Sequence, residues 1–182
     1  MSEMFPRRVF LRGLGVVAAA AALTACSSTN EAVNQALIEG AVGGIVAADC
    51  KIGRMTYWAA NATVPVYEIS FRIVMTNVSS KPVTLSGDNF ATTLDGTPIP
   101  PFNFSARDVG DADIWRTYDS LTIRPGEERS VALAYEISQP TYDSWYKSSR
   151  TVAVSFTCGN QRVTYTKNSR SDEITVSDIE TL

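Results

Sequence analysis

The stretch from Tyr67 to Asn77, YEISFRIVMTN, is the feature that most limits how this chain can fold. Every second position in it is apolar, and the residues between are mostly polar; the apolar set is Tyr67, Ile69, Phe71, Ile73 and Met75. A strict period of two predicts a β-strand with one buried face. Such a strand is not stable alone, so later segments must cover its apolar face.

Further short segments alternate in the same way and are separated by turn signals. Val131 to Ile137 and Val152 to Cys158 are the clearest of them. Asp95-Gly96 is a strong hairpin signal, and Pro125-Gly126 marks another turn. Seven to nine short strands of this kind predict an all-β fold, an antiparallel β-sandwich over residues 49–182.

The N-terminal segment has the pattern of an export signal. Arg7, Arg8 and Arg12 precede a short apolar run that ends in Leu23-Thr-Ala-Cys26. A basic start, a short apolar core and small residues before a cysteine predict a signal peptide over residues 1–25, and the run is too short to span a bilayer comfortably.

Two resemblances refine this leader. Leu23 to Cys26 resembles a bacterial lipobox, whose cysteine is diacylated and becomes the new N-terminus. The arginine pair resembles a twin-arginine export signal, and general secretion remains the other route. We therefore expect Cys26 to anchor the protein by lipid on the extracytoplasmic face of the cell membrane. Residues 26–48 are expected to form a tether that is partly helical.

Composition excludes several classes of function. The chain has 182 residues, of which 45% are hydrophobic, so it can form one domain with a real core. Its net charge of −3 argues against a nucleic-acid partner, which requires a basic face. The absence of histidine removes the commonest general base and the commonest transition-metal ligand. We expect neither a cofactor nor an enzymatic activity.

The turns and strand ends resemble a known family. Thr76-Asn77, Lys81-Pro82-Val83, Asp95-Gly96 and Pro125-Gly126 are similar to positions in immunoglobulin-like domains of bacterial lipoproteins whose function is unassigned. The resemblance covers roughly residues 50 to 166. It implies an extracytoplasmic immunoglobulin-like β-sandwich and brings no catalytic residues with it.

Five aromatic residues fall in connections rather than on the alternating strands. They are Trp115, Tyr118, Tyr142, Trp145 and Tyr146. Loop aromatics either form a platform for a partner, here an envelope protein or a wall polymer, or fold down and close the ends of the sandwich. The first role predicts a membrane-anchored binding or accessory module.

Acidic residues gather in the segment from Asn103 to Asp119, which we expect to be a long polar loop. Asp108, Asp111 and Asp113 are a weak candidate for a calcium site, or simply a solvated acidic loop. Paired carboxylates such as Asp111 and Asp113 also suit an alternative function, a small hydrolase of wall glycans. Ser144 to Lys147 matches an S-x-x-K motif but lacks its partner motifs, so we treat it as a chance spacing.

Two cysteines remain once Cys26 carries lipid. Cys50 and Cys158 are predicted to form a disulfide, because an exported protein meets an oxidising compartment. The alternative is two buried free cysteines that act as small hydrophobic residues.

Overall fold

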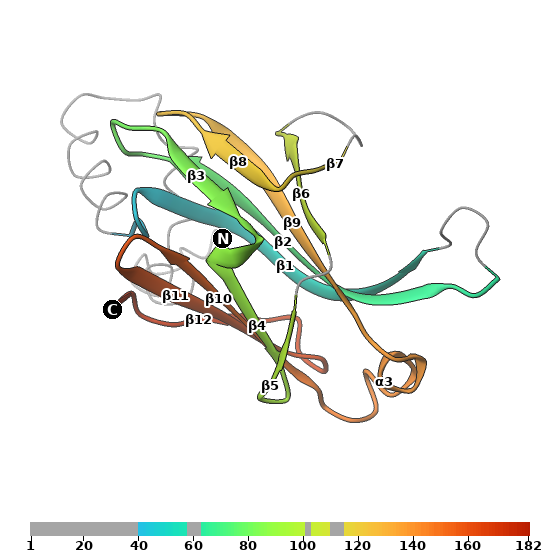
Figure 1. Cartoon of the computed structure of the whole chain (residues 1–182). Coiled ribbons are helices and arrows are strands. Elements are labelled where there is room, and N and C mark those ends of the chain that lie inside the picture. The colour runs from blue at the N-terminus through green and yellow to red at the C-terminus, as the bar shows by residue number, and fades with distance from the viewer. Residues whose placement is uncertain (1–39, 58–62, 101–102, 110–114) are drawn as a thin grey trace, which may run out of the picture.

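The computed structural model describes residues 40–57, 63–100, 103–109 and 115–182, and in them two antiparallel sheets face each other (Figure 1). The first, called the β2 sheet, has the order β1 (Ile45–Tyr57), β2 (Val66–Asn77), β9 (Glu128–Glu136), β6 (Asn103–Asp108) and β7 (Arg116–Thr117). The second, the β10 sheet, has the order β12 (Ile174–Val176), β11 (Gln161–Asn168), β10 (Thr151–Cys158), β4 (Phe90–Leu94) and β5 (Thr97–Ile99), with β13 (Glu180–Thr181) also pairing with β11. A two-stranded ladder joins β3 (Val83–Ser86) to β8 (Ser120–Ile123).

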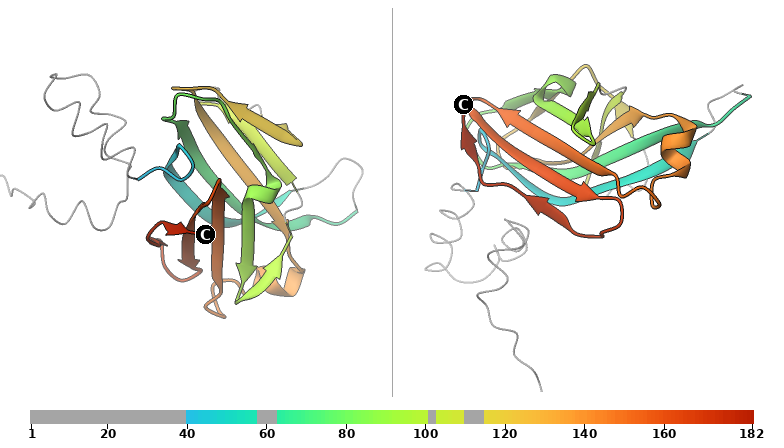
Figure 2. Two further views of the ribbon diagram at one scale, coloured as in Figure 1. Left: turned by 60° about the vertical axis from the view of Figure 1, so that its left-hand side comes forward. Right: turned by 90° about the horizontal axis from the view of Figure 1, so that it is seen from below.

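This arrangement confirms the predicted antiparallel β-sandwich. The described residues hold thirteen strands rather than seven to nine, because edge strands such as β7 and β13 have two residues each and show no alternation. The helical elements of the described residues are a 3₁₀ turn, η2 (Gly87–Asn89), and one short helix, α3 (Gln139–Asp143), at one end of the sandwich (Figure 2). Neither is long and apolar enough to cross a membrane.

The core lies between the inner faces of the two sheets. On β2 the residues predicted to be buried, from Ile69 to Met75 at every second position, have at most 1% of their surface exposed. Val152, Val154 and Phe156 of β10 face them from the other sheet and are equally buried. Burying an apolar side chain of this size contributes about 1.5 to 3 kcal/mol, so this interface supplies most of the driving force for folding.

The domain begins earlier than the sequence predicts. Residues 40–48 were expected to belong to the tether, but Val42 and Ile45 are buried in the core and β1 starts at Ile45, before the predicted start of the domain at residue 49. Gly43 and Gly44 make the turn, with φ of 58° and 84°. A Cβ on Gly43 would lie 2.5 Å from Sγ of Cys158, and one on Gly44 would lie 2.7 Å from Cβ of Ser79. These glycines therefore serve close packing against the domain and do not loosen a tether.

The predicted polar loop from Asn103 to Asp119 is also wrong in its first part. β6 occupies Asn103–Asp108 and pairs with β9 along its whole length. Phe104, Ser105 and Ala106 are consecutive buried residues, so the segment has no alternation by which a strand could be recognised.

The structure contains no disulfide between Cys50 and Cys158, and both are free thiols. Cys158 ends β10 opposite Gln161, whereas Cys50 on β1 lies within electrostatic reach of Tyr165 and Lys167 on β11. Gln161 and Tyr165 are four residues apart, roughly 13 Å along a strand, and a disulfide needs Cα atoms within about 7 Å. The disulfide prediction is therefore wrong, and the alternative of two free cysteines holds. Burial raises the pKa of the Cys50 thiol to about 12, which keeps it unreactive near neutral pH.

One fully buried polar side chain joins several of these strands. The Nδ2 of Asn77 donates hydrogen bonds to the carbonyls of Lys81 and Ile123, both at 2.8 Å. Its Oδ1 accepts from the backbone N–H and the hydroxyl of Ser79 at 2.9 and 2.7 Å. The backbone of Asn77 also pairs with Gly126 and Glu127 in the turn before β9. Every polar group of this residue is satisfied, and together they fix the ends of β2, β8 and the start of β9.

We expect Asn77→Ala to lower the free energy of unfolding by about 2 to 4 kcal/mol, because two buried carbonyls lose their donors. Asn77→Asp keeps the shape but not the two N–H donors, and it should destabilise the protein by at least as much at neutral pH. Urea unfolding followed by circular dichroism measures both. Asn160→Ala, at an exposed turn, is the matched control, and an equal loss in that variant would contradict the assignment.

Candidate binding site on the outer face of the sheet

Trp115 lies over the outer face of the β2 sheet, between arginines from two different strands. The guanidinium carbon of Arg72, on β2, is 5.5 Å from the centre of the Trp115 ring, and that of Arg107, on β6, is 5.0 Å away. Strand β9 separates the two arginines, so the indole spans the middle of the sheet. Cation–π contacts of this kind stabilise a guanidinium by about 0.5 to 1 kcal/mol at exposed sites and hold it in a fixed plane.

A shallow pocket of about 240 Å³ opens beside Arg72. Its lining comes from adjacent positions on two neighbouring strands: Lys51, Ile52, Gly53, Arg54 and Met55 on β1, and Ser70 and Arg72 on β2. The β1–β2 register places Lys51 opposite Arg72 and Gly53 opposite Ser70. Small residues therefore form the floor, and two basic residues stand together at one end.

The floor is open because Gly53 has no side chain. A Cβ on Gly53 would meet no atom within 4 Å, and its φ is not in the left-handed region, so neither packing nor backbone conformation requires glycine. A glycine within a strand weakens it and often marks a place where another molecule approaches the backbone. Arg72 is oriented across this floor, since its Nε donates to the Ser70 hydroxyl at 3.3 Å and its Nη2 reaches the Met55 sulfur at 3.8 Å.

A buried acidic residue, Glu68, lies at the far end of the outer face of the β2 sheet. Glu68 is the next outward-facing position of β2 after Ser70, is 5% exposed and has Glu136 of β9 as its register partner. Burial raises the pKa of the Glu68 carboxyl above its ordinary value of 4.5, and the charge of Arg72 opposes that rise. The ionised form of Glu68 is therefore destabilised in the folded protein.

Glu68→Gln should stabilise the protein at pH 7 and leave its stability nearly unchanged at pH 4. The folded state binds the Glu68 proton more tightly than the unfolded state, so the wild type loses stability as pH rises from 4.5 through the raised pKa, and glutamine removes that loss. Melting temperatures between pH 4 and 8 measure the effect. Lys51 and Arg72 also face this region. If glutamine stabilises the protein equally at both pH values, the charge of Glu68 is not the cause of the stabilisation.

The other aromatic residues mainly close one end of the sandwich. Trp145 is 3% exposed, and its carbonyl accepts a 2.6 Å hydrogen bond from the Ser169 hydroxyl. The Tyr142 ring packs on Tyr67 with centres 5.0 Å apart. Arg54 lies over the rings of Tyr142 and Tyr146, at 4.1 and 4.7 Å from their centres.

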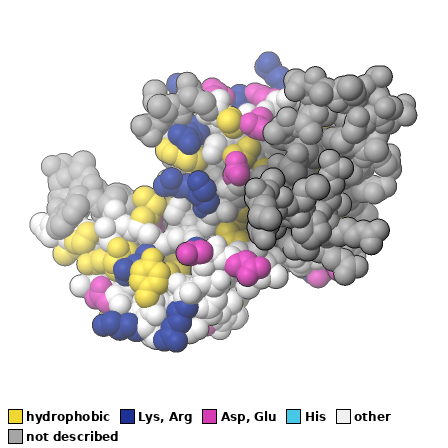
Figure 3. All heavy atoms as spheres, turned by 180° about the vertical axis from the view of Figure 1, so that it is seen from behind, with side chains coloured by type: hydrophobic (Ala, Val, Ile, Leu, Met, Phe, Trp, Pro, Cys, Tyr) yellow, Lys and Arg dark blue, Asp and Glu magenta, His cyan; other side chains and the backbone are white. Residues whose placement is uncertain are grey.

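The structure thus separates the five predicted binding aromatics into two groups. Trp145, Tyr142 and Tyr118 pack against the core, as expected if loop aromatics close the sandwich. Trp115 is half-buried over the sheet, and Tyr146 is exposed. Figure 3 views the molecule from behind, and the face turned to the viewer shows basic side chains beside hydrophobic ones.

Alanine substitutions should separate these two groups. Trp145→Ala removes a buried ring and should lower the free energy of unfolding by about 3 to 5 kcal/mol, whereas Trp115→Ala should cost no more than about 1 kcal/mol. Chemical unfolding of the two variants measures both values. A large loss in Trp115→Ala would show that this ring is structural rather than available for binding.

The remaining sequence candidates that the structure describes do not assemble into a reactive site. Asp108 forms an ion pair with Arg129, so its carboxylate already has a cationic partner, while Asp111 and Asp113 lie outside the described residues. Within the described ranges no three acidic or sulfur ligands come together as a metal site. The Ser144 hydroxyl donates to the carbonyl of Thr141 and accepts from Arg150, whose side chain has N–H donors only and cannot act as its base.

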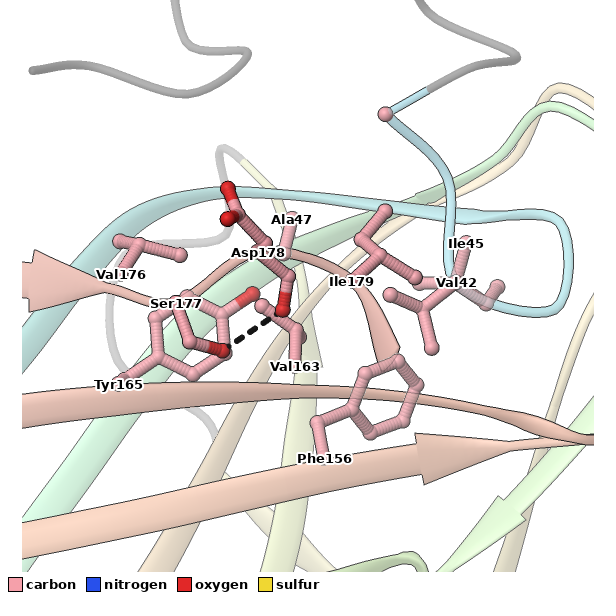
Figure 4. Close-up of a pocket in the computed structure, with 11 residues that line it drawn as sticks. Val42, Ile45, Ala47, Phe156, Val163, Tyr165, Val176, Ser177, Asp178 and Ile179 are labelled. Carbon is pink, nitrogen blue, oxygen red and sulfur yellow. Dashed lines mark hydrogen bonds between the residues drawn. The ribbon is translucent and has the colours of Figure 1, made fainter. Parts of the chain in front are cut away.

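A second pocket, of about 210 Å³, lies between the start of β1 and the β10 sheet (Figure 4). Val42, Ile45 and Ala47 line one side, Phe156, Val163 and Tyr165 line the other, and the segment 176–179 covers it. Its lining is mostly apolar; the Ser177 hydroxyl in it donates to the carbonyl of Asp178 at 2.9 Å. Sequence reasoning missed both pockets, because each depends on which residues stand opposite one another across strands.

Comparisons with known proteins give structural similarity only. No protein-family model matches the chain, and no curated protein sequence matches it. Among solved structures, an uncharacterised β-sandwich protein from Clostridium difficile is 16% identical, with 68% of this chain and 83% of that chain covered and a TM-score of 0.41. The yjhA protein from Bacillus subtilis is also 16% identical (62% and 73% covered, TM-score 0.39), and a protein from Archaeoglobus fulgidus is 12% identical (74% and 98% covered, TM-score 0.33).

Proposed function

We propose that this protein is a lipid-anchored, extracytoplasmic binding or accessory module of the cell envelope. Its leader, residues 1–25, and the lipobox cysteine Cys26 support export and anchoring. The observation that carries the binding role is the open pocket over Gly53 and Ser70, with Arg72 held against Trp115 at its edge. Tryptophan, tyrosine and arginine are the residue types most enriched among the side chains that carry the binding energy of protein interfaces.

The charges of the pocket favour a partner with acidic groups. Lys51 and Arg72 are both exposed, and lysine and arginine side chains offer N–H donors and no acceptor. Such a pair binds and orients an anion rather than taking a proton from a substrate. An anionic wall polymer or an acidic surface of an envelope protein is the kind of partner that fits.

The alternative, a carboxylate-dependent hydrolase of wall glycans, gains no support from the described residues. It relied on Asp111 and Asp113, which lie outside them. The nearest acidic pair on the binding face is Glu68 and Glu136, at the end opposite the basic residues. Release of soluble sugar from purified wall by the protein would favour the hydrolase over the binding module.

Gly53→Trp should lower the affinity of the detergent-solubilised protein for its purified cell envelope by at least about ten-fold, equivalent to about 1.4 kcal/mol. The new side chain has open space above the strand, so it should fill the pocket without a large change in melting temperature. Sedimentation of protein with envelope fragments at several protein concentrations measures the affinity.

Ala153→Trp is the matched control, because it adds the same bulk to the outer face of the β10 sheet. Equal binding by the Gly53→Trp variant and the wild type would overturn the assignment of the pocket. Mass spectrometry of the N-terminal peptide tests the anchor separately: an unmodified Cys26 thiol in cells with an active lipoprotein pathway would contradict it.

A further inference from the structure

Two basic side chains stand directly opposite each other on the outer face of the β2 sheet. Lys51 of β1 and Arg72 of β2 are register partners in an antiparallel pair. Side chains in such positions have Cβ atoms about 4.5 to 5.5 Å apart, and like charges there destabilise the sheet. An arrangement that lowers stability and is not needed for packing is expected where a ligand compensates for it.

Neither residue is neutralised within the described part of the chain. Arg129, Arg150 and Arg162 each have a carboxylate within 4.0 Å, but no such ion pair is formed by Lys51 or Arg72 there. Glu68 acts on Arg72 only through longer-range electrostatics, and it lies beyond Ser70, at the other end of the floor. The positive charge of Lys51 and Arg72 is therefore concentrated at one end of the pocket, while the guanidinium of Arg54, the third basic residue of the lining, lies over Tyr142 and Tyr146.

We infer that this end of the pocket binds a phosphate group. The inference rests on the proposed binding function and names the chemistry of its ligand. A guanidinium held in plane by Trp115 and Ser70 offers two N–H donors in a fork, and the Lys51 ammonium beside it adds a mobile point charge. Together they match a tetrahedral anion with several oxygens better than a single planar carboxylate.

The open floor of the pocket extends the inferred ligand from a phosphate group to a phosphodiester. The groups next to a phosphodiester are uncharged, and Gly53, Ser70 and Met55 offer a shallow, uncharged surface beside the basic pair. The backbone at Gly53 is accessible without obstruction, so a chain of sugar or glycerol units can pass across it. A wall polymer linked by phosphodiesters and free phosphate share this chemistry, and the experiment distinguishes them.

The test uses the detergent-solubilised full-length protein, titrated calorimetrically with inorganic phosphate, with a glycerol phosphodiester and with acetate. We expect the diester to bind more tightly than acetate, and the affinity to fall at least about ten-fold in Arg72→Gln, in Lys51→Gln and when sodium chloride is raised from 50 to 500 mM. Lys51→Arg should retain binding. Arg162→Gln removes one positive charge at the opposite edge, where Arg162 pairs with Glu180, and should leave binding unchanged.

Each outcome bears on one of the two proposals. Binding of the diester over inorganic phosphate supports a polymer ligand, and equal binding supports a site for the phosphate group itself. No binding of either phosphate probe, equal binding of acetate, or the same loss in Arg162→Gln as in Arg72→Gln overturns the inference. If envelope binding still depends on Gly53 in that case, the binding function stands without phosphate recognition. If the diester binds but the envelope does not, the envelope role fails.

Discussion

The hydrogen bonds of Asn77 are the interaction on which the rest of this fold depends. Its side-chain amide joins the end of β2 to the turn before β3 and to the end of β8, and its backbone pairs with the turn before β9. In a buried position each of these groups would be unfavourable without a partner, so one residue sets where four segments meet. It also fixes the β2 ladder with β1 and β9. The pairing of Lys51 with Arg72 lies beyond an irregularity between Ala48 and Lys51, where the β1–β2 register shifts.

The sequence predicted the elements whose signal is local. The period of two from Tyr67 to Asn77 gives β2, and Asp95-Gly96 forms the expected hairpin turn, with φ of 51° and 80°. β6 escaped prediction because three consecutive residues in it are buried. The disulfide failed because it was inferred from the cysteine count, whereas Gly43, in the turn before β1, and not Cys50 packs against Cys158.

The candidate site shows the same limit. Trp115 was identified because an aromatic residue in a loop is visible in the sequence. Arg72 and Gly53 were not, because an exposed arginine and a strand glycine are ordinary until the register sets them side by side. The loop aromatics also differ in how deeply they are buried, which their spacing in the sequence does not reveal. Trp145 supports the end of the sandwich, whereas Trp115 lies on its surface. Fold and site therefore use the same residue type for different tasks.

The tight turn at Gly43 and Gly44 has a mechanical consequence. These two residues are pressed against Cys158 and Ser79, and Val42 and Ile45 on either side are buried. A pull on the chain before Gly40 thus acts on the core at the point where Ile45 pairs with Asn77, without a slack loop to absorb it. Force would be shared at once between both sheets.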